Sequence, residues 1–192
     1  ARQWDFIAET LLGLRAELGQ LGQGLVVRSG EICAVLNGLR TELGDFTLWA
    51  HEETGNGWTY ARDRRVAGWC RAAGLPFHEI KNHGVTRAMA TRNGWASSWD
   101  SFMNEPLTAA PALRPLEALK LGPIPTSKEL RLAPDRCDGR QRGGRKAGLE
   151  TLHSFLSERA PPYRKAMSSP LAGARHCSRL SPYLAWGALS LR

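Results

Sequence analysis

Residues 177–192, CSRLSPYLAWGALSLR, contain the side chains whose types and spacing most favour the binding of an anion. Ser178 and Ser181 carry hydroxyls, and Arg179 carries a guanidinium that can pair with a phosphate through two parallel hydrogen bonds. Ser181 suits the N-cap of a following helix, and Pro182 suits its first helical position. The free amides and the dipole of such a helix end attract negative charge. A capped helix without a ligand has the same local pattern, so both interpretations stay open.

Basic side chains are concentrated in the last third of the chain. The 192 residues include 26 Lys and Arg against 18 Asp and Glu, for a net charge of +8. Residues 1–126 hold 13 side chains of each sign, whereas residues 127–192 hold 13 basic and 5 acidic ones. A positive field confined to one region is typical of a surface that binds a polyanion, and a solvated basic face is the alternative.

Composition predicts a soluble globular protein of the cytoplasm. The chain is 42% apolar and 23% charged, and no apolar run approaches the roughly 20 residues that span a bilayer. Its first residues lack the apolar region of a signal peptide, so we expect no membrane partner. The four cysteines are far apart and the five histidines form no HxxxH pair, so we expect reduced thiols and no metal site.

Strands and helices alternate through the first half, which predicts an α/β fold. Apolar residues at three- and four-residue steps predict helices at residues 4–21, 32–43 and 58–73. Short apolar runs predict strands at residues 24–30, 46–51 and 75–80. This order implies right-handed crossovers and a parallel sheet with helices on both faces. The first helix should pack its apolar stripe into the core, namely Trp4, Ile7, Leu11, Leu14, Leu18 and Leu21.

The second half is predicted to be a linker followed by helices. After a short helix near residues 95–102, six prolines lie between residues 104 and 135 without sustained periodicity, which indicates an extended linker. The basic segment RCDGRQRGGRKAG then leads into a helix. The expected apolar face of this helix is Leu149, Leu152, Phe155 and Leu156.

The motif CSRLSPYLAWG resembles the flavin phosphate-binding signature of the DNA photolyase and cryptochrome family, in which Thr-Ser-Arg-Leu-Ser-Pro is the usual opening. Cys177 stands in the place of the usual Thr, which removes one hydroxyl. The resemblance continues through HEETGNGWTYARDRRVAGWCRAAGLPFHEI, NHGVTRAMATRNGWASSWDSFM and the segment that opens with RGGRKAGLETLHSFL. It therefore covers most of the chain.

This resemblance implies three segments. Residues 1–103 would be a Rossmann-like α/β domain of the kind that holds a light-harvesting antenna, residues 104–143 the interdomain linker, and residues 144–192 the first helices of an all-α FAD-binding domain. The strand, helix and strand with which the family begins have no counterpart before Arg2, and the chain stops soon after the motif. We therefore expect a fragment that is inactive alone, from a protein that is a monomer at full length.

The resemblance also implies a function. A deoxyribodipyrimidine photolyase uses light and reduced FAD to transfer an electron to a pyrimidine dimer that is flipped out of DNA. Such a lyase would have dimer-containing DNA as its partner, and the basic last third favours it because repair needs phosphate contacts. One alternative is a cryptochrome, a blue-light receptor that binds FAD without repair. Another, from outside the family, is a non-catalytic nucleotide-binding α/β module.

The cofactor-binding residues are carried over from the family position by position. Tyr163 would contact the phosphate or ribitol region of FAD, although an aromatic side chain packed at a turn is equally consistent with the sequence. Ser178, Arg179, Leu180 and Ser181 would line the flavin phosphates through hydroxyls and main-chain amides. The family's catalytic residues have no counterpart within these 192 residues, so we assign none.

An antenna chromophore of the pterin or deazaflavin type is also implied. Many folate-binding members have an Asn-Glu pair where this chain has Trp58 and Thr59, which leaves the donors of a pterin without their usual carboxylate. Residues 52–54, at the carboxyl end of a predicted strand, lie where open α/β sheets bind ligands. They could serve another antenna or none.

Overall fold

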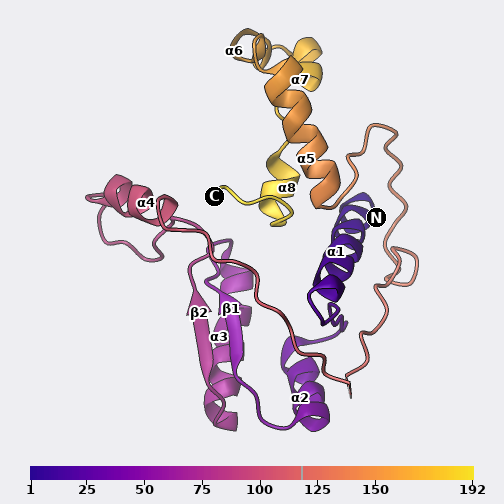
Figure 1. The fold of residues 1–192 in the computed structure, drawn as a ribbon, viewed down its shortest axis with the longest axis vertical. Helices are drawn as coiled ribbons and strands as arrows, with labels where there is room; N and C mark the ends of the chain where they lie inside the picture. The colour runs from indigo at the N-terminus through magenta and orange to yellow at the C-terminus, as the bar shows by residue number, and fades with distance from the viewer. Residues whose placement is uncertain (118) are drawn as a thin grey trace. The chain divides into compact units, whose positions relative to one another are not determined.

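The computed structural model describes residues 1–117 and 119–192, except for the side chain of Ala174, and it divides into two compact units (Figure 1). The first, which we call the helical unit, comprises Ala1–Val27, Pro111–Pro115 and Leu121–Leu191. The second, the α/β unit, comprises Arg28–Ala110, Leu116–Lys120 and Arg192.

The α/β unit contains two parallel strands and three helices. Its strands are β1 (Leu48–His51) and β2 (Phe77–Ile80), and its helices are α2 (Ile32–Leu43), α3 (Gly57–Ala73) and α4 (Trp95–Met103). Leu48 lies opposite Phe77, and His51 lies opposite Ile80. The predicted α/β class and the predicted parallel pairing are therefore confirmed.

Local capping fixes where α2 and α3 begin. The Glu31 carboxylate accepts a hydrogen bond from the Ala34 amide at 3.0 Å, and the Asn56 side-chain oxygen accepts from the amides of Trp58 and Thr59, both at 3.0 Å. These acceptors satisfy amides that have no partner within the first turn of a helix. Gly74 ends α3 with a φ of 71°, a left-handed conformation that glycine adopts without steric cost.

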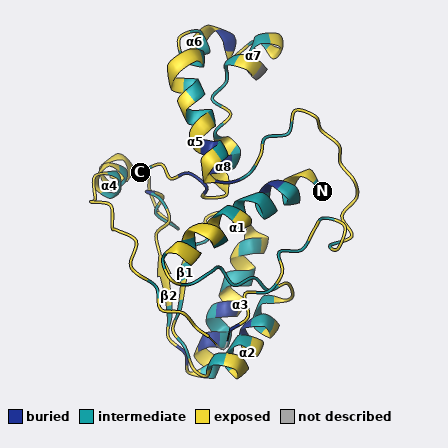
Figure 2. Cartoon of the chain, turned by 45° about the vertical axis from the view of Figure 1, so that its right-hand side comes forward, coloured by how far each residue is buried: buried dark blue, intermediate teal, exposed yellow. Residues whose placement is uncertain are grey.

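The core of the α/β unit lies between its helices and one face of the sheet. Leu36, Val66 and Cys70 form a buried cluster, against which Leu48 of β1 and Phe77 of β2 pack (Figure 2). The opposite face carries Trp49, which is 62% exposed and whose ring stacks on that of His78 at 4.2 Å. The expectation of helices on both faces of the sheet is therefore wrong for this unit as described, because α2 and α3 share one side.

The strand predicted at residues 24–30 is not formed. The Val27 amide instead donates to the Leu121 carbonyl at 2.7 Å, and the Arg15 Nε donates to the Leu25 carbonyl at 3.0 Å. A strand forms only where a neighbouring strand supplies the remaining donors and acceptors. Among the described residues the segment bonds to the linker and to a side chain, so its β-branched and apolar composition does not produce a strand.

The helical unit is built from α1 (Arg2–Gln20), α5 (Arg145–Ser154), a π-helical turn η1 (Phe155–Arg159), and three short helices. These are α6 (Tyr163–Ala166), α7 (Pro170–His176) and α8 (Ser181–Ala185). Its buried core consists of Phe6, Tyr183, Ala188 and Leu189. The rings of Phe6 and Tyr183 lie 5.3 Å apart, so α1 and α8 meet at this core.

The predicted apolar faces of α1 and α5 differ from the observed ones. The buried residue of α1 is Phe6, outside the predicted stripe, and Leu14 is exposed. In the α5 region Leu149 and Leu156 are exposed, whereas Gly148 is buried against Tyr183 and Leu189. The π-helical turn changes the period of the chain after Ser154, and the absence of a side chain at position 148 lets α5 approach the core closely.

The predicted linker is irregular in structure. The described residues between α4 and α5 form turns and extended segments but no helix or strand. Within the helical unit, the Leu113 amide donates to the Leu21 carbonyl at 2.6 Å, and the Trp4 Nε1 donates to the Pro125 carbonyl at 2.7 Å. Separately, none of the described helices is both long enough and apolar enough to cross a membrane.

Candidate functional site

Residues 177–181, which we call the motif loop, lead from the end of α7 to the first residue of α8 in the helical unit. Ser181 is the first helical residue of α8, so Leu180 occupies the N-cap and no side chain caps the helix. The predictions of a Ser181 N-cap and of Pro182 at the first helical position are therefore wrong by one residue. Because α8 has only five residues, its dipole contributes little, and the expected attraction of an anion by the helix end is not the main feature here.

The backbone of the motif loop supplies a different kind of anion site. Arg179 has a φ of 59°, in the left-handed region, and Leu180 follows with φ −86° and ψ −16°, in the right-handed region. Successive residues of opposite hand turn their amides into a shared concavity that suits an anion. Within the described part of the chain, the backbone amides of Ser178, Arg179 and Leu180 donate no hydrogen bond.

The carbonyls of the same loop are occupied. The Arg159 guanidinium donates to the carbonyl oxygens of Cys177 and Ser178, the latter at 3.4 Å. The Gln141 Nε2 donates to the Arg179 carbonyl at 2.8 Å. A loop whose acceptors are satisfied and whose donors are free can accommodate a negatively charged group.

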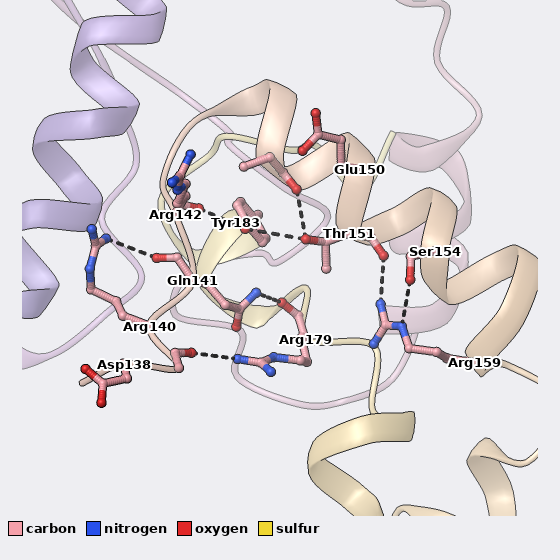
Figure 3. A pocket seen from close by; sticks show the side chains of 12 residues that line it. Asp138, Arg140, Gln141, Arg142, Glu150, Thr151, Ser154, Arg159, Arg179 and Tyr183 are labelled. Atoms are coloured by element: carbon pink, nitrogen blue, oxygen red, sulfur yellow. Dashed lines mark hydrogen bonds between the residues drawn. The ribbon is translucent and has the colours of Figure 1, made fainter.

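A cavity of about 480 Å³ lies beside the motif loop (Figure 3). Its lining includes Arg179 but none of the other predicted cofactor-binding residues, Tyr163, Ser178, Leu180 and Ser181. The lining residues come from the basic segment, from α5 and η1, and from the motif loop and α8: Asp138, Gly139, Arg140, Gln141, Arg142, Ala147, Glu150, Thr151, Ser154, Arg159, Arg179 and Tyr183.

Most of the positive charge in this cavity is bonded to the protein itself. The Arg140 guanidinium holds both oxygens of Glu9, at 2.6 and 2.9 Å, and it lowers the pKa of Glu9 while its own pKa is raised by this carboxylate. Arg179 donates to the Gly139 carbonyl at 3.2 Å. Since Arg159 is also bonded to carbonyls, the cavity acts mainly to fix the loops that surround it.

The other predicted cofactor-binding residues occupy different environments. Tyr163 begins α6, half-buried, with its ring edge-on to Phe155 at 5.4 Å and 84°. Leu180 packs against the core of the helical unit, Ser178 is half-buried, and Ser181 is exposed. The structure thus brings residues 178–181 together in one loop, and it places Tyr163 in an aromatic contact outside the cavity.

Arg159 and Gln141 are the residues of this region that the sequence did not reveal. Arg159 bonds to Ser154 Oγ at 3.1 Å and to the Thr151 carbonyl at 2.8 Å in addition to its bonds to the motif loop. No spacing rule connects a residue of the α5 region to a loop 18 or 19 positions later. Only the run of basic residues around Gln141 indicated that its segment could be functional.

The polar residues at the carboxyl ends of β1 and β2 form a separate cluster in the α/β unit. Thr54 Oγ1 lies 3.1 Å from His83 Nε2, and Arg62 pairs with Glu53 at 3.5 Å and with Asp63 at 2.7 Å. An apolar cavity of about 290 Å³ lies nearby, lined in part by His51, Arg62 and Phe77. These residues lie where an antenna was expected, and its presence stays a prediction.

Comparison with known proteins identifies relatives over nearly the whole chain. The family described as DNA photolyase matches residues 1–106. Cryptochrome DASH of Idiomarina loihiensis is 27% identical over 199 residues, which cover 99% of this chain and 43% of that protein. Cryptochrome DASH of Natronomonas pharaonis is 27% identical over 207 residues, covering 97% and 43%. The chain therefore spans about two fifths of the length of these curated relatives.

Solved structures share the fold. The Synechocystis sp. PCC6803 cryptochrome has a TM-score of 0.75 at 20% identity, covering 98% of this chain and 42% of that one. A class III photolyase from Agrobacterium tumefaciens has a TM-score of 0.69 at 20% identity, with the same coverage. The archaeal photolyase from Sulfolobus tokodaii, described with two FAD molecules, has a TM-score of 0.63 at 22% identity, covering 99% and 42%.

Proposed function

Because the chain belongs to the DNA photolyase family, we propose that the protein is a FAD-dependent deoxyribodipyrimidine photolyase that uses light to repair pyrimidine dimers in DNA. Bound reduced FAD would supply the electron that light transfers to the dimer. The residues of this chain would hold that cofactor and contribute to the surface that meets DNA. The alternative from outside the family, a nucleotide-binding module, is set aside by the family match.

The proposal that FAD binds here rests on the hydrogen bonding of the motif loop. Three consecutive backbone amides, of Ser178, Arg179 and Leu180, are free while the carbonyls of Cys177, Ser178 and Arg179 accept hydrogen bonds. The diphosphate of FAD offers acceptors and negative charge, which this loop can receive. The chemistry of the loop therefore fits the cofactor.

We assign roles to the predicted residues on this basis. The hydroxyls of Ser178 and Ser181 and the amides of Arg179 and Leu180 would hold the phosphates. Tyr163 would contact the phosphate or ribitol region, for which its position next to Phe155 gives it a fixed ring orientation. The free hydroxyl of an ordered tyrosine can bind such a group without a large entropy loss.

The charge distribution supports DNA as the partner. The excess of positive charge lies in residues 127–192, which hold 13 basic and 5 acidic side chains. Contacts between such residues and phosphates give an affinity that falls as salt is added. The proposed repair reaction also needs access to a nucleotide flipped out of the duplex.

A cryptochrome that binds FAD without repair is the second candidate. Two observations favour it, namely the curated relatives named cryptochrome DASH and the cryptochrome from Synechocystis with its TM-score of 0.75. Both candidates need the same flavin-binding loop. They differ in whether light acts on DNA.

A repair assay on the whole purified protein distinguishes the candidates. Single-stranded and duplex oligonucleotides with one pyrimidine dimer are illuminated with blue light in the presence of reductant, and restored pyrimidines are measured by chromatography against a dark control. We expect stoichiometric flavin absorbance and light-dependent repair. Bound flavin without repair of either substrate would refute the photolyase function and support the cryptochrome function. Absence of flavin would refute both candidates.

A further inference from the structure

We propose that Arg159, assisted by Gln141, is a positioning residue that turns the free amides of the motif loop toward the flavin phosphates. This inference rests on the proposed function. It assigns a role to residues that lie outside the signature, and it explains how a loop with a left-handed arginine is held in one conformation.

Arg159 connects three parts of the helical unit. Its Nε donates to Ser154 Oγ at 3.1 Å and its Nη2 to the Thr151 carbonyl at 2.8 Å, both on α5. Its Nη1 and Nη2 reach across to the carbonyls of Cys177 and Ser178. All three nitrogens of the guanidinium are thus used, and the side chain fastens the motif loop to α5.

Peptide geometry determines where the amides of the motif loop point when Arg159 and Gln141 hold its carbonyls. In a trans peptide the carbonyl and the amide of the same unit point in opposite directions, and the described chain has no cis peptide. When Arg159 holds the Cys177 and Ser178 carbonyls, the amides of Ser178 and Arg179 face away from it. When Gln141 holds the Arg179 carbonyl at 2.8 Å, the Leu180 amide faces away from Gln141.

The same geometry assigns the two sides of the loop. Arg159 and Gln141 line the cavity of about 480 Å³, so the carbonyl side of the loop faces that cavity. The free amides then face the other side. The residues that line the cavity therefore hold the motif loop from its carbonyl side, and the phosphates would bind on the other side of the loop.

The π-helical turn places Arg159 for this task. The Ala160 amide donates to the Phe155 carbonyl at 2.8 Å, five residues earlier, which defines the turn. In a regular α-helix, residues 154 and 159 would point about 140° apart at 3.6 residues per turn. The wider turn brings Arg159 back over Ser154. From this position its guanidinium reaches the carbonyls of the motif loop.

Lysine cannot replace this arginine. The guanidinium presents five donors in a fixed plane, whereas an ammonium presents its donors from a single atom. The four acceptors around Arg159 lie on Thr151, Ser154, Cys177 and Ser178. Arg159→Lys should therefore retain the charge and lose the orientation of the loop.

The test compares Arg159→Lys, Arg159→Gln and the matched control Arg145→Gln in the whole protein. Arg145 is an exposed arginine at the start of α5, away from the motif loop in sequence. Apoprotein is titrated with FAD and with riboflavin, which has the same ring and ribityl chain but no phosphate. Hydrogen exchange of the Cys177 amide, which donates to the Gly173 carbonyl at 2.8 Å, and the midpoint of urea unfolding are measured on the same samples.

We expect both Arg159 variants to bind FAD about tenfold more weakly, the loss typical of one charged hydrogen bond, with riboflavin binding unchanged and faster exchange of the Cys177 amide, whose neighbouring carbonyl Arg159 holds. Arg145→Gln should match the wild type. Equal losses for FAD and riboflavin, or unchanged FAD affinity and exchange, would overturn the inference. If the wild type binds neither flavin, the proposed function fails, and the exchange measurement alone then decides whether Arg159 orients the loop.

Discussion

At the scale of single residues, Arg179 combines a charged side chain with an unusual backbone. Its φ of 59° is a conformation that costs a non-glycine residue roughly 1–2 kcal/mol, so the contacts around it must maintain it. The contacts that do so are the bond from Gln141 to its carbonyl and the bond from its guanidinium to Gly139. The side chain of Arg179 therefore helps to hold the motif loop, and its backbone amide is the part that would bind the phosphates.

Replacing Arg179 by alanine in the whole protein should weaken FAD binding roughly tenfold, because the bond from its guanidinium to the Gly139 carbonyl is lost and alanine is strained at a φ of 59°. Arg179→Gly is the informative companion, since glycine adopts the positive φ without strain and removes the same guanidinium. Fluorescence titration of apoprotein measures both affinities. Retention of FAD at the wild-type level by both variants would refute a role of the Arg179 side chain in holding the motif loop for the phosphates.

Glu9 is predicted to contribute stability that depends on pH. Hydrogen bonds from Arg140, together with one from the Gly143 amide, lower the pKa of Glu9 below 4.5 in the folded state. A carboxylate whose folded pKa is lowered stabilises the protein above its unfolded pKa, and the contribution is lost as the pH falls through the folded pKa.

Glu9→Gln should therefore destabilise the helical unit by about 1 kcal/mol at pH 7, a modest value because the pair is partly exposed, and the difference should shrink below pH 4.5. Urea unfolding at several pH values measures it. Glu17→Gln, at an exposed position of the same helix, is the control. A difference that is constant with pH would show that the Glu9 charge is not responsible.

At the scale of elements, glycine governs the packing of α5. A Cβ atom at Gly148 would lie 3.0 Å from side-chain atoms of both Tyr183 and Leu189, two buried members of the core. Contacts this short force the neighbours to move. The close approach of α5 to α8 is therefore possible because position 148 has no side chain.

Gly148→Ala should destabilise the helical unit by about 1–3 kcal/mol through overpacking. Gly13→Ala on α1, where a Cβ would meet nothing within 4 Å, should instead stabilise it by roughly 0.5–1 kcal/mol, because alanine has the higher helix propensity. Thermal unfolding followed by circular dichroism compares the two. The same sign of change for both variants would contradict this account of α5.

At the scale of the whole chain, the amount of exposed surface is large. The described chain exposes 13,920 Å². Two separate compact domains, each of half the mass of this chain, would together expose about 10,900 Å². The larger area of this chain therefore does not depend on how its two units are placed. The chain therefore buries less surface than two independent domains of this combined size, and Trp58 and Leu171 are among the large apolar residues left exposed.

Residues 1–192 by themselves should consequently unfold with low cooperativity, bind a hydrophobic dye and retain little FAD. The physical reason is that too little apolar area is buried to offset the conformational entropy of the chain. Differential scanning calorimetry, dye fluorescence and flavin absorbance test this. A sharp two-state transition together with stoichiometric flavin would contradict it.

The sequence by itself determined the local features of this protein. Helical periodicity predicted α2 and α3 within one residue of their observed starts, because this signal acts over a few positions. Alternation of strands and helices predicted the parallel pairing of β1 and β2. The motif around Arg179 predicted the family, which the match to residues 1–106 confirms.

Tertiary structure alone decided the features that depend on distant partners. Residues 24–30 have the composition of a strand, but a strand needs a neighbouring strand, and the Val27 amide bonds to the Leu121 carbonyl of the linker instead. Ser181 has the side chain of an N-cap, but Leu180 before it is already right-handed and occupies the N-cap, so that Ser181 is the first residue of α8. The role of Arg159 follows from a π-helical turn and from carbonyls 18 and 19 positions away, contacts that no local pattern encodes.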